Sequence, residues 1–134
     1  LGIFLTLRAT LPTMKRQRSG QIVVTNSVRG FVGGAGSSLY CASKFAVRGM
    51  MQSVRAEVSP FGIKVGSVFP GGIDTAWWQD ASRGGRQPGT TDTSTMWDAD
   101  DVALEMMDII EQGPESNIEE IEMKWTSPGE LSGG

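Results

Sequence analysis

The sequence predicts a partial, doubly wound parallel α/β sheet in which three strands alternate with helices. Two observations carry this prediction: three stretches have apolar residues at helical spacing, and three short runs between and after them have strand patterns, the first rich in β-branched residues and the last only roughly alternating. Strands that are separated by helices are typical of a parallel sheet. Because both faces of such a sheet must be covered, three strands are few, and we expect the 134 residues to be part of a longer protein.

The first helix is expected over residues 1–17, followed by a strand over Gln21–Asn26. The chain begins directly on the apolar run LGIFLTL with no capping residue, so it is expected to enter this helix part-way along. Pro12 is expected to kink the helix or end its regular hydrogen bonding, and Ser19-Gly20 separates it from the strand. The expected buried stripe of the helix comprises Leu1, Phe4, Leu7, Leu11 and Met14.

A glycine-rich loop, a second helix and a second strand follow. Residues 28–38 contain four glycines and no periodic pattern, which predicts a loop. The helix is expected over Leu39–Val58, and the strand over Ile63–Phe69 is expected to end sharply at Pro70-Gly71. The residues expected to share one face of this helix are Tyr40, Lys44, Val47 and Met51.

The last third of the chain contains a short helix, a polar stretch, a longer helix and a strand. Residues 74–81 are expected to form the short helix, and residues 83–95, which carry no core pattern, are expected to be mobile. Asp98 is expected to cap the longer helix, the final strand is expected over Ile118–Trp125, and the tail 126–134 is expected to be disordered. The expected buried stripe of the longer helix comprises Val102, Met106, Ile109 and Ile110.

The composition argues against several classes of protein. The chain carries 12 basic and 15 acidic residues without a clustered basic face, so we expect no nucleic-acid partner. The short cluster Lys15–Arg18 is expected to be a solvated helix end. Because Cys41 is the only cysteine, an internal disulfide is excluded and a reducing, cytoplasmic location is expected. No apolar run approaches the roughly 18 residues that a membrane span needs, so we expect no membrane partner and no secretory signal.

Features that are separated in the sequence are expected to meet at one edge of the sheet. Ser27 directly follows the first strand and Pro70-Gly71 follows the second, while Tyr40 and Lys44 lie in the first two turns of the helix between them. In a parallel sheet, ligands bind outside the carboxyl ends of the strands. These residues therefore define the candidate site.

The residue types at this edge suit proton transfer. Tyr40 is the only tyrosine, and the chain has no histidine. A free tyrosine has a pKa of about 10, but an ammonium group within about 4–6 Å favours the phenolate. The i, i+4 spacing from Tyr40 to Lys44 supplies that proximity, and the hydroxyl of Ser27 can donate to the same substrate oxygen. The pattern therefore predicts an acid/base unit.

Structural explanations compete with these functional ones. A tyrosine and a lysine at this spacing occur by chance on many helices, and Ser27 can be a turn residue. The loop glycines lack the GxGxxG spacing, so we expect a flexible loop and not a phosphate cradle. Cys41 is expected to pack in its helix because no histidine is present to activate it. Trp77 and Trp78 can belong either to the core or to an apolar lid.

Taken together, these residues resemble the active-site core of the short-chain dehydrogenase/reductase family. The family's pattern is a Tyr-x-x-x-Lys helix with a serine thirteen residues before the tyrosine, and Tyr40, Lys44 and Ser27 reproduce it. The stretches YCASKFAVRGMMQSVRAEV and GIKVGSVFPGGIDT are similar to the family's helix, strand and Pro-Gly loop. The resemblance implies that residues 1–125 are the carboxyl-terminal half of a Rossmann-like domain, truncated at its amino terminus, with a lid over residues 74–97.

The resemblance also implies a role for each candidate residue. Tyr40 would be the catalytic acid/base and Ser27 would orient the substrate oxygen, while Lys44 would support the tyrosine and bind the nicotinamide ribose. The implied cofactor is NAD or NADP, with no metal. The first helix and the Tyr40 helix match the pair that commonly builds a dimer, which implies a homodimer or homotetramer of the full-length protein. Tyr40 and Lys44 would share the binding of the cofactor with Pro70, Gly71, Ile73 and Thr75.

The chain departs from the family pattern in three respects. The phosphate-binding TGxxxGxG loop is absent, and the residue that selects NAD or NADP is absent with it. The family's active-site asparagine would fall just before Leu1. Asn26 stands where many members carry a serine, which leaves the match at Ser27 intact.

We therefore expect an NAD(P)-dependent oxidoreductase that interconverts a small-molecule carbonyl and a secondary alcohol by hydride transfer. The alternative is a non-catalytic cofactor-binding or dimer-scaffold protein of the same fold; a scaffold has no need of the intact set Ser27, Tyr40 and Lys44. Residues 1–134 alone are expected to be inactive, because their sheet would expose an unpaired edge and an uncovered apolar face.

Overall fold

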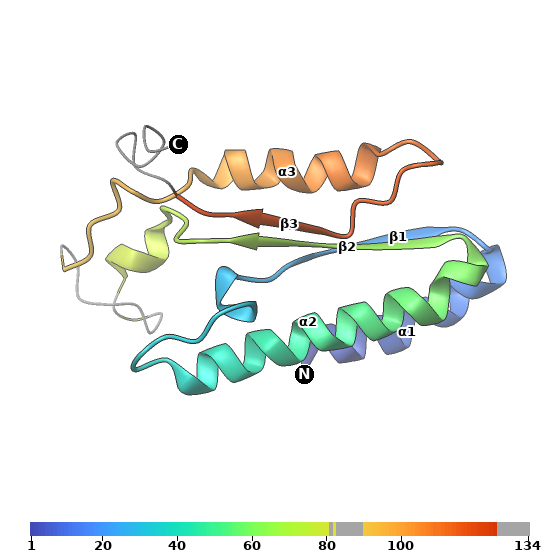
Figure 1. Ribbon diagram of the computed structural model, residues 1–134, viewed down its shortest axis with the longest axis horizontal. Helices are drawn as coiled ribbons and strands as arrows, with labels where there is room; N and C mark the ends of the chain where they lie inside the picture. Colours follow the sequence, from blue (N-terminus) through green and yellow to red (C-terminus); the bar gives the residue numbers. More distant parts are fainter. Residues whose placement is uncertain (81, 83–89, 126–134) are drawn as a thin grey trace, which may run out of the picture.

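The chain forms a three-stranded parallel sheet with helices on both faces (Figure 1). The computed structural model describes residues 1–80, 82 and 90–125. Within these residues the strand order is β1-β2-β3 and both strand pairs are parallel, which confirms the predicted partial parallel sheet. The helices and strands are α1 (Gly2–Gln17), β1 (Gly20–Thr25), α2 (Ser38–Val58), β2 (Ile63–Pro70), α3 (Ala99–Glu111) and β3 (Glu120–Met123), with short 3-10 helices η1 (Val28–Gly30), η2 (Ser59–Phe61) and η3 (Ala76–Gln79).

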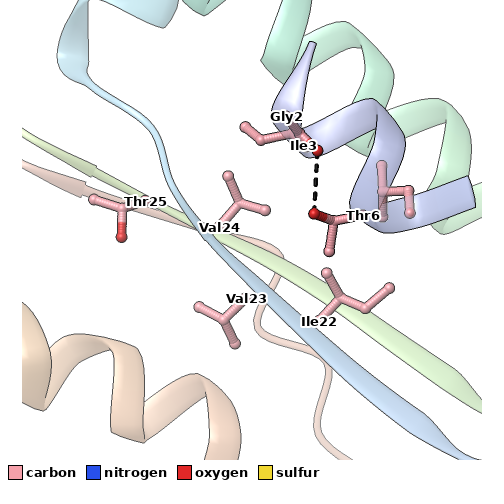
Figure 2. A pocket seen from close by; sticks show the side chains of 8 residues that line it. Gly2, Ile3, Thr6, Ile22, Val23, Val24 and Thr25 are labelled. Carbon is pink, nitrogen blue, oxygen red and sulfur yellow. Dashed lines mark hydrogen bonds between the residues drawn. The ribbon is translucent and has the colours of Figure 1, made fainter. Parts of the chain in front are cut away.

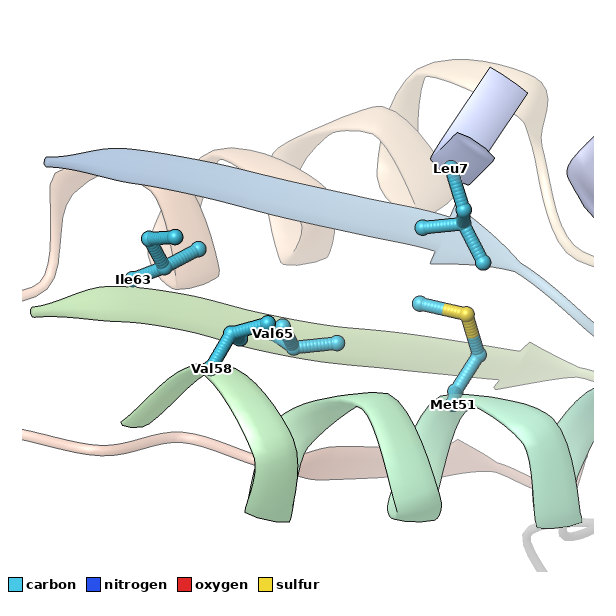
Figure 3. Packing of buried hydrophobic residues seen from close by; sticks show 5 residues of the cluster. All are labelled: Leu7, Met51, Val58, Ile63 and Val65. Carbon is cyan, nitrogen blue, oxygen red and sulfur yellow. The ribbon is translucent and has the colours of Figure 1, made fainter. Parts of the chain in front are cut away.

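The core consists of two apolar clusters on opposite faces of β2. Helices α1 and α2 cover one face of the sheet and α3 covers the other (Figure 1). Figure 3 shows the central side chains of the first cluster, which come from α1, α2 and β2. They are Leu7, Met51, Val58, Ile63 and Val65. The second cluster consists of Val68, Val102, Ile109 and Met123.

The two crossover connections of the sheet have opposite hand. The strands β1, β2 and β3 follow one another in a single direction across the sheet. The connection through α2 passes over one face, and the connection through α3 passes over the other (Figure 1). Since about 98% of parallel crossovers are right-handed, one of the two is an exception. Both faces of β2 are covered as a result, and seven of its eight residues are buried.

The stripe predicted for α1 is partly wrong. Leu7 is buried, and Leu11 and Met14 pack beside it as expected. Leu1 is 94% exposed and Phe4 is 50% exposed, whereas Ile3 packs against the cluster. Helical spacing thus places Phe4 beside Leu7 and Leu11, but the structure buries the Ile3 side of this face and leaves Phe4 half exposed.

Helix α1 also continues through Pro12 instead of ending there. Its end is Arg18, which has a left-handed backbone with φ of 51°. The basic cluster here is not simply solvated, because Lys15 and Arg18 lie over the ring of Phe61 at 5.2 and 5.9 Å from its centroid.

Helix α3 begins after its predicted cap, but one residue near its carboxyl end that was predicted to be buried is exposed. Asp98 Oδ1 accepts a hydrogen bond of 2.8 Å from the amide of Asp100. Val102 and Ile109 are buried, but Ile110, which was predicted to be buried, is 45% exposed. Gly66 of β2 allows α3 to pack closely on the sheet, since a Cβ at this position would lie 2.5 Å from Ile109 Cγ2.

The other helices and strands differ from their predicted residue ranges only at their ends. Strand β1 begins at Gly20 and ends at Thr25, and β3 covers only Glu120–Met123 of the predicted 118–125. The predicted short helix within 74–81 is the 3-10 helix η3, and the predicted loop contains η1. The predicted tail 126–134 and most of the stretch predicted to be mobile, residues 83–89, lie outside the described residues. None of the described helices is both long and apolar enough to span a bilayer.

Candidate active site

Ser27 lies immediately beyond the carboxyl end of β1 and opens η1. It is buried, and its Oγ accepts a hydrogen bond of 3.2 Å from the amide of Arg29, so it caps the 3-10 helix. The turn role considered from the sequence is therefore real. A hydroxyl that accepts this bond still has its own proton to donate, so the turn role and a functional role are compatible.

The first two turns of α2 carry Tyr40 and Lys44. Tyr40 is 49% exposed, and its hydroxyl makes no hydrogen bond within the described residues. Lys44 Nζ lies 5.6 Å from the centre of the Tyr40 ring. The same ammonium donates to the backbone carbonyl of Asn26 at 3.3 Å. The structure thus brings Tyr40 and Lys44 together and ties them to the end of β1, next to Ser27.

Asn26 is a site residue that the sequence did not single out. Its Nδ2 donates to the backbone carbonyl of Lys44 at 3.2 Å, and its own carbonyl accepts from Lys44 Nζ. Its Oδ1 is buried and has no hydrogen-bond partner among the described residues. The available signal was its position, a polar side chain at the end of a β-branched run and directly before Ser27.

Gly30 allows the loop after Ser27 to pass closely over α2. A Cβ at this glycine would lie 3.2 Å from Asn26 Nδ2, 3.2 Å from a ring carbon of Phe69 and 3.3 Å from the carbonyl oxygen of Lys44. The closeness of these atoms explains why a residue without a side chain stands here.

The loop after β2 contributes the other predicted cofactor residues. Pro70 is the buried last residue of β2, and the amide of Gly71 donates to the carbonyl of Met123 at 2.9 Å. Ile73 pairs with Trp97 in a parallel bridge and packs against the second cluster. Thr75 is exposed and precedes η3 without capping it through its side chain. Of these residues, Thr75 has the most accessible polar group.

The tryptophans divide between the core and the surface. Trp97 packs against the second cluster, whereas Trp77 is 41% exposed. Trp78 is fixed by a hydrogen bond of 2.8 Å from its Nε1 to the carbonyl of Ile73, and its ring meets that of Trp77 edge-on at 4.7 Å. Trp77 therefore offers an aromatic surface beyond the carboxyl end of β2.

An ion pair lies one helical turn beyond Lys44. Arg48 Nε and Nη2 donate to the two carboxylate oxygens of Glu120 at 3.1 and 2.8 Å. These hydrogen bonds hold the pKa of Glu120 below its usual range, against the effect of partial burial. Gln52 Nε2 donates to the same carboxylate at 3.0 Å.

The groove shown in Figure 2 is separate from these residues. It has a volume of about 420 Å³ and lies between α1 and the free edge of β1. Its lining does not include Ser27, Tyr40 or Lys44. The residues that line it are Gly2, Ile3, Thr6, Leu7, Ile22, Val23, Val24 and Thr25.

Proteins of known sequence resemble this chain over much of its length. Short-chain dehydrogenase/reductase homolog YusR of Bacillus subtilis (strain 168) is 34% identical over 112 residues, which cover 83% of this chain and 86% of YusR. 17-beta-hydroxysteroid dehydrogenase type 1 of Homo sapiens is 39% identical over 79 residues, 59% of this chain and 24% of that protein. The match thus spans about a quarter of the human relative's length.

Solved structures show the same fold. Carveol dehydrogenase from Mycobacterium avium, in complex with NAD, superimposes with a TM-score of 0.76 at 22% identity, over 90% of this chain and 50% of that one. Alcohol dehydrogenase from Thermococcus sibiricus, complexed with 5-hydroxy-NADP, gives a TM-score of 0.75 at 23% identity, over 93% of this chain and 49% of that one. The sheet is therefore Rossmann-like.

The sequence model of the short chain dehydrogenase family matches residues 1–85, which contain β1, α2 and β2. The matched region includes Ser27, Tyr40 and Lys44. By this match and by its likeness to YusR, the chain belongs to the short-chain dehydrogenase family, whose members named here are oxidoreductases.

Proposed function

We propose that the intact protein interconverts a carbonyl and a secondary alcohol with NAD or NADP, and that Tyr40 moves the proton. The observation that carries this proposal is the grouping of Tyr40, Lys44 and Ser27 at the carboxyl edge of the sheet in a chain of this family. The grouping supports the proposal because each of the three supplies a group that the reaction needs.

Tyr40 is placed to exchange a proton with a substrate oxygen. Its side chain is half exposed, and its hydroxyl is free of hydrogen bonds within the described residues. The ammonium of Lys44 lies 5.6 Å from the centre of the Tyr40 ring. Ser27 can donate the proton of its Oγ to the same substrate oxygen, since that Oγ already accepts from Arg29. A hydrogen bond of this kind stabilises a developing alkoxide.

The donors at this edge fit the ribose and carboxamide of a nicotinamide nucleotide. Lys44 uses one of its three N–H donors on Asn26, so two remain for neighbouring hydroxyls. Asn26 Oδ1 is a buried acceptor without a partner among the described residues, and the hydroxyl of Thr75 is exposed. When bound, NAD(P) would supply or accept the hydride.

Replacement of Tyr40 by phenylalanine tests the proposal. In the intact protein, Tyr40→Phe should lower kcat by at least about 100-fold, the usual contribution of a general acid/base, while NAD(P)H still binds. Turnover is measured by NAD(P)H absorbance with a panel of cyclic ketones, including steroid and terpenoid ketones, because the relatives include a hydroxysteroid and a carveol dehydrogenase. Cofactor binding is measured by fluorescence titration.

Ser53→Ala is a matched control for the removal of a hydroxyl from the same helix. Among the described residues, the hydroxyl of Ser53 bonds only to the carbonyl of Gly49, at 3.0 Å and within α2. Its variant should keep wild-type turnover. A Tyr40→Phe protein with wild-type turnover would contradict the proposed role of Tyr40.

A further inference from the structure

We propose that Arg48 is a positioning residue that clamps the loop carrying Ser27 onto α2. The effect of this clamp on catalysis rests on the proposed function, but the contact between Arg48 and the loop can be tested without measuring turnover. Arg48 lies on the same face of α2 as Lys44, one turn further along. It contacts the loop after Ser27 through Phe31 and the sheet through Glu120.

Hydrogen bonds to Glu120 fix the orientation of the Arg48 guanidinium. Both carboxylate oxygens of Glu120, the first residue of β3, accept hydrogen bonds from it at 2.8 and 3.1 Å. Gln52 donates to the same carboxylate from the next turn of α2. A two-point contact between a guanidinium and a carboxylate fixes orientation as well as distance. The side chains of Arg48 and Glu120 are 29% and 20% exposed, so the pair is partly shielded from water.

The flat face of the guanidinium covers the ring of Phe31. The Cζ atom of Arg48 lies 3.8 Å from the centre of that ring. Phe31 also contacts the fully buried ring of Phe69, at a centroid distance of 4.4 Å. Phe31 thus contacts both a cation on α2 and an aromatic ring on β2, and Arg48 Cζ also lies 5.8 Å from the centre of the Phe69 ring. The 3-10 helix η1 lies between α2 and the sheet (Figure 1).

Phe31 completes the turn that Ser27 begins. The amide of Gly30 donates to the carbonyl of Ser27 at 2.8 Å, and the amide of Phe31 donates to the carbonyl of Val28 at 3.0 Å. The segment is therefore attached to α2 on both sides of Ser27. Before it, Asn26 bonds Lys44, and after it, Phe31 lies under Arg48.

Lysine could not replace arginine in this position. A lysine ammonium is a point charge without a flat face, so it can neither hold both oxygens of Glu120 nor stack on Phe31. Arg48→Lys therefore keeps the charge and removes the geometry of the clamp.

The test compares Arg48→Lys with Arg55→Lys in the intact protein. Arg55 is a control on the same helix: it pairs with the Glu119 carboxylate at 3.1 Å and donates to the carbonyls of Val65 and Glu119, but contacts no aromatic ring within the described residues. Hydrogen exchange of the Gly30 and Phe31 amides reports the clamp, and kcat and the cofactor Kd report its effect on the site. Phe31→Leu is a second variant, which keeps the ion pair and removes the ring.

Arg48→Lys and Phe31→Leu should each speed exchange of the two amides by roughly tenfold, because the turn opens locally more often. Each should lower kcat by roughly tenfold with the cofactor Kd unchanged, since a misplaced Ser27 costs rate and not cofactor affinity. Arg55→Lys should change neither quantity. Amides that exchange no faster in Arg48→Lys than in Arg55→Lys would overturn the clamp. Responding amides in a protein that turns over no carbonyl would support the clamp and overturn the proposed function instead.

Discussion

Lys44 is held in its place by a single residue, Asn26, from two directions. The Asn26 carbonyl accepts from the ammonium, and the Asn26 amide group donates to the Lys44 backbone carbonyl. Such paired contacts fix both the tip and the base of a long side chain, which otherwise has about 2 kcal/mol of rotamer entropy to lose on ordering. The ammonium can therefore stay near Tyr40, although no carboxylate of residues 1–80, 82 or 90–125 pairs with it.

Glu120 makes the stability of the fold depend on pH. Hydrogen bonds from Arg48 lower the pKa of Glu120 in the folded protein, and those from Gln52 and the charges of Arg48 and Arg55 act in the same direction. A carboxyl group with a lowered folded pKa binds fewer protons folded than unfolded. Its contribution is therefore fully present above the unfolded pKa of about 4.3 and is lost as pH falls through the folded value.

The comparison of wild type with Glu120→Gln tests this dependence. Glutamine keeps the size of the side chain but cannot titrate. In the intact protein, the free energy of unfolding of the wild type should exceed that of Glu120→Gln at pH 6–7, and the difference should shrink as pH falls below about 4.3. Urea denaturation at a series of pH values measures it. A difference that stays constant from pH 6 to pH 3 would show that Glu120 does not carry this effect.

The sequence predicted which candidate residues lie near one another but not the tertiary contacts that hold them. Ser27, Tyr40 and Lys44 were placed at one edge because parallel topology brings the ends of strands together, and the structure places them there. Asn26 and Arg48 were not predicted, because their partners lie 18 and 72 residues away and no local pattern reports such pairs. Their roles depend on tertiary contacts alone.

At the level of elements, periodicity predicted the type of each helix and strand but not always its buried face. In α1, Ile3, Leu7 and Leu11 pack in the core, whereas Phe4, three residues before Leu7, is half exposed. In α3 the adjacent isoleucines, Ile109 and Ile110, cannot both face the sheet, and the close approach at Gly66 selects Ile109. Amphipathic spacing leaves such choices open when apolar residues outnumber the positions on one face.

The packing of η1 on α2 depends on the absence of a side chain at Gly30. Gly30→Ala would add a Cβ within 3.3 Å of atoms from β2, α2 and Asn26. In the intact protein we expect a loss of about 1–3 kcal/mol in the free energy of unfolding, the usual cost of overpacking, and a lower kcat because the Ser27 loop moves off α2.

Gly33 provides the matched control in the same loop. A Cβ at Gly33 would meet no atom within 4 Å, and this glycine is exposed. Gly33→Ala should therefore leave both the denaturation midpoint and kcat near wild type. Equal effects of the two substitutions would show that crowding at Gly30 is not the cause.

At the scale of the whole molecule, the outer edge of β1 has no partner strand within the described residues and lies beside an apolar groove. Strand β1 pairs with β2 on one side only, and its outer edge faces the groove of about 420 Å³ that Ile22, Val23 and Val24 help to line (Figure 2). An exposed parallel edge with apolar side chains favours association with another strand. The chain also spans about half the length of the solved dehydrogenases whose fold it shares.

Residues 1–134 by themselves should therefore lack a cooperative fold and tight cofactor binding. Small domains bury too little surface to tolerate an open strand edge. Scanning calorimetry of this chain should show no single cooperative transition, and fluorescence titration should show no micromolar affinity for NADH. Carveol dehydrogenase from Mycobacterium avium, of which the matched region is 50%, serves as the full-length control. A calorimetric enthalpy equal to the van't Hoff enthalpy, together with micromolar NADH binding, would contradict the expectation, because both require that the edge of β1 be stable without a partner strand.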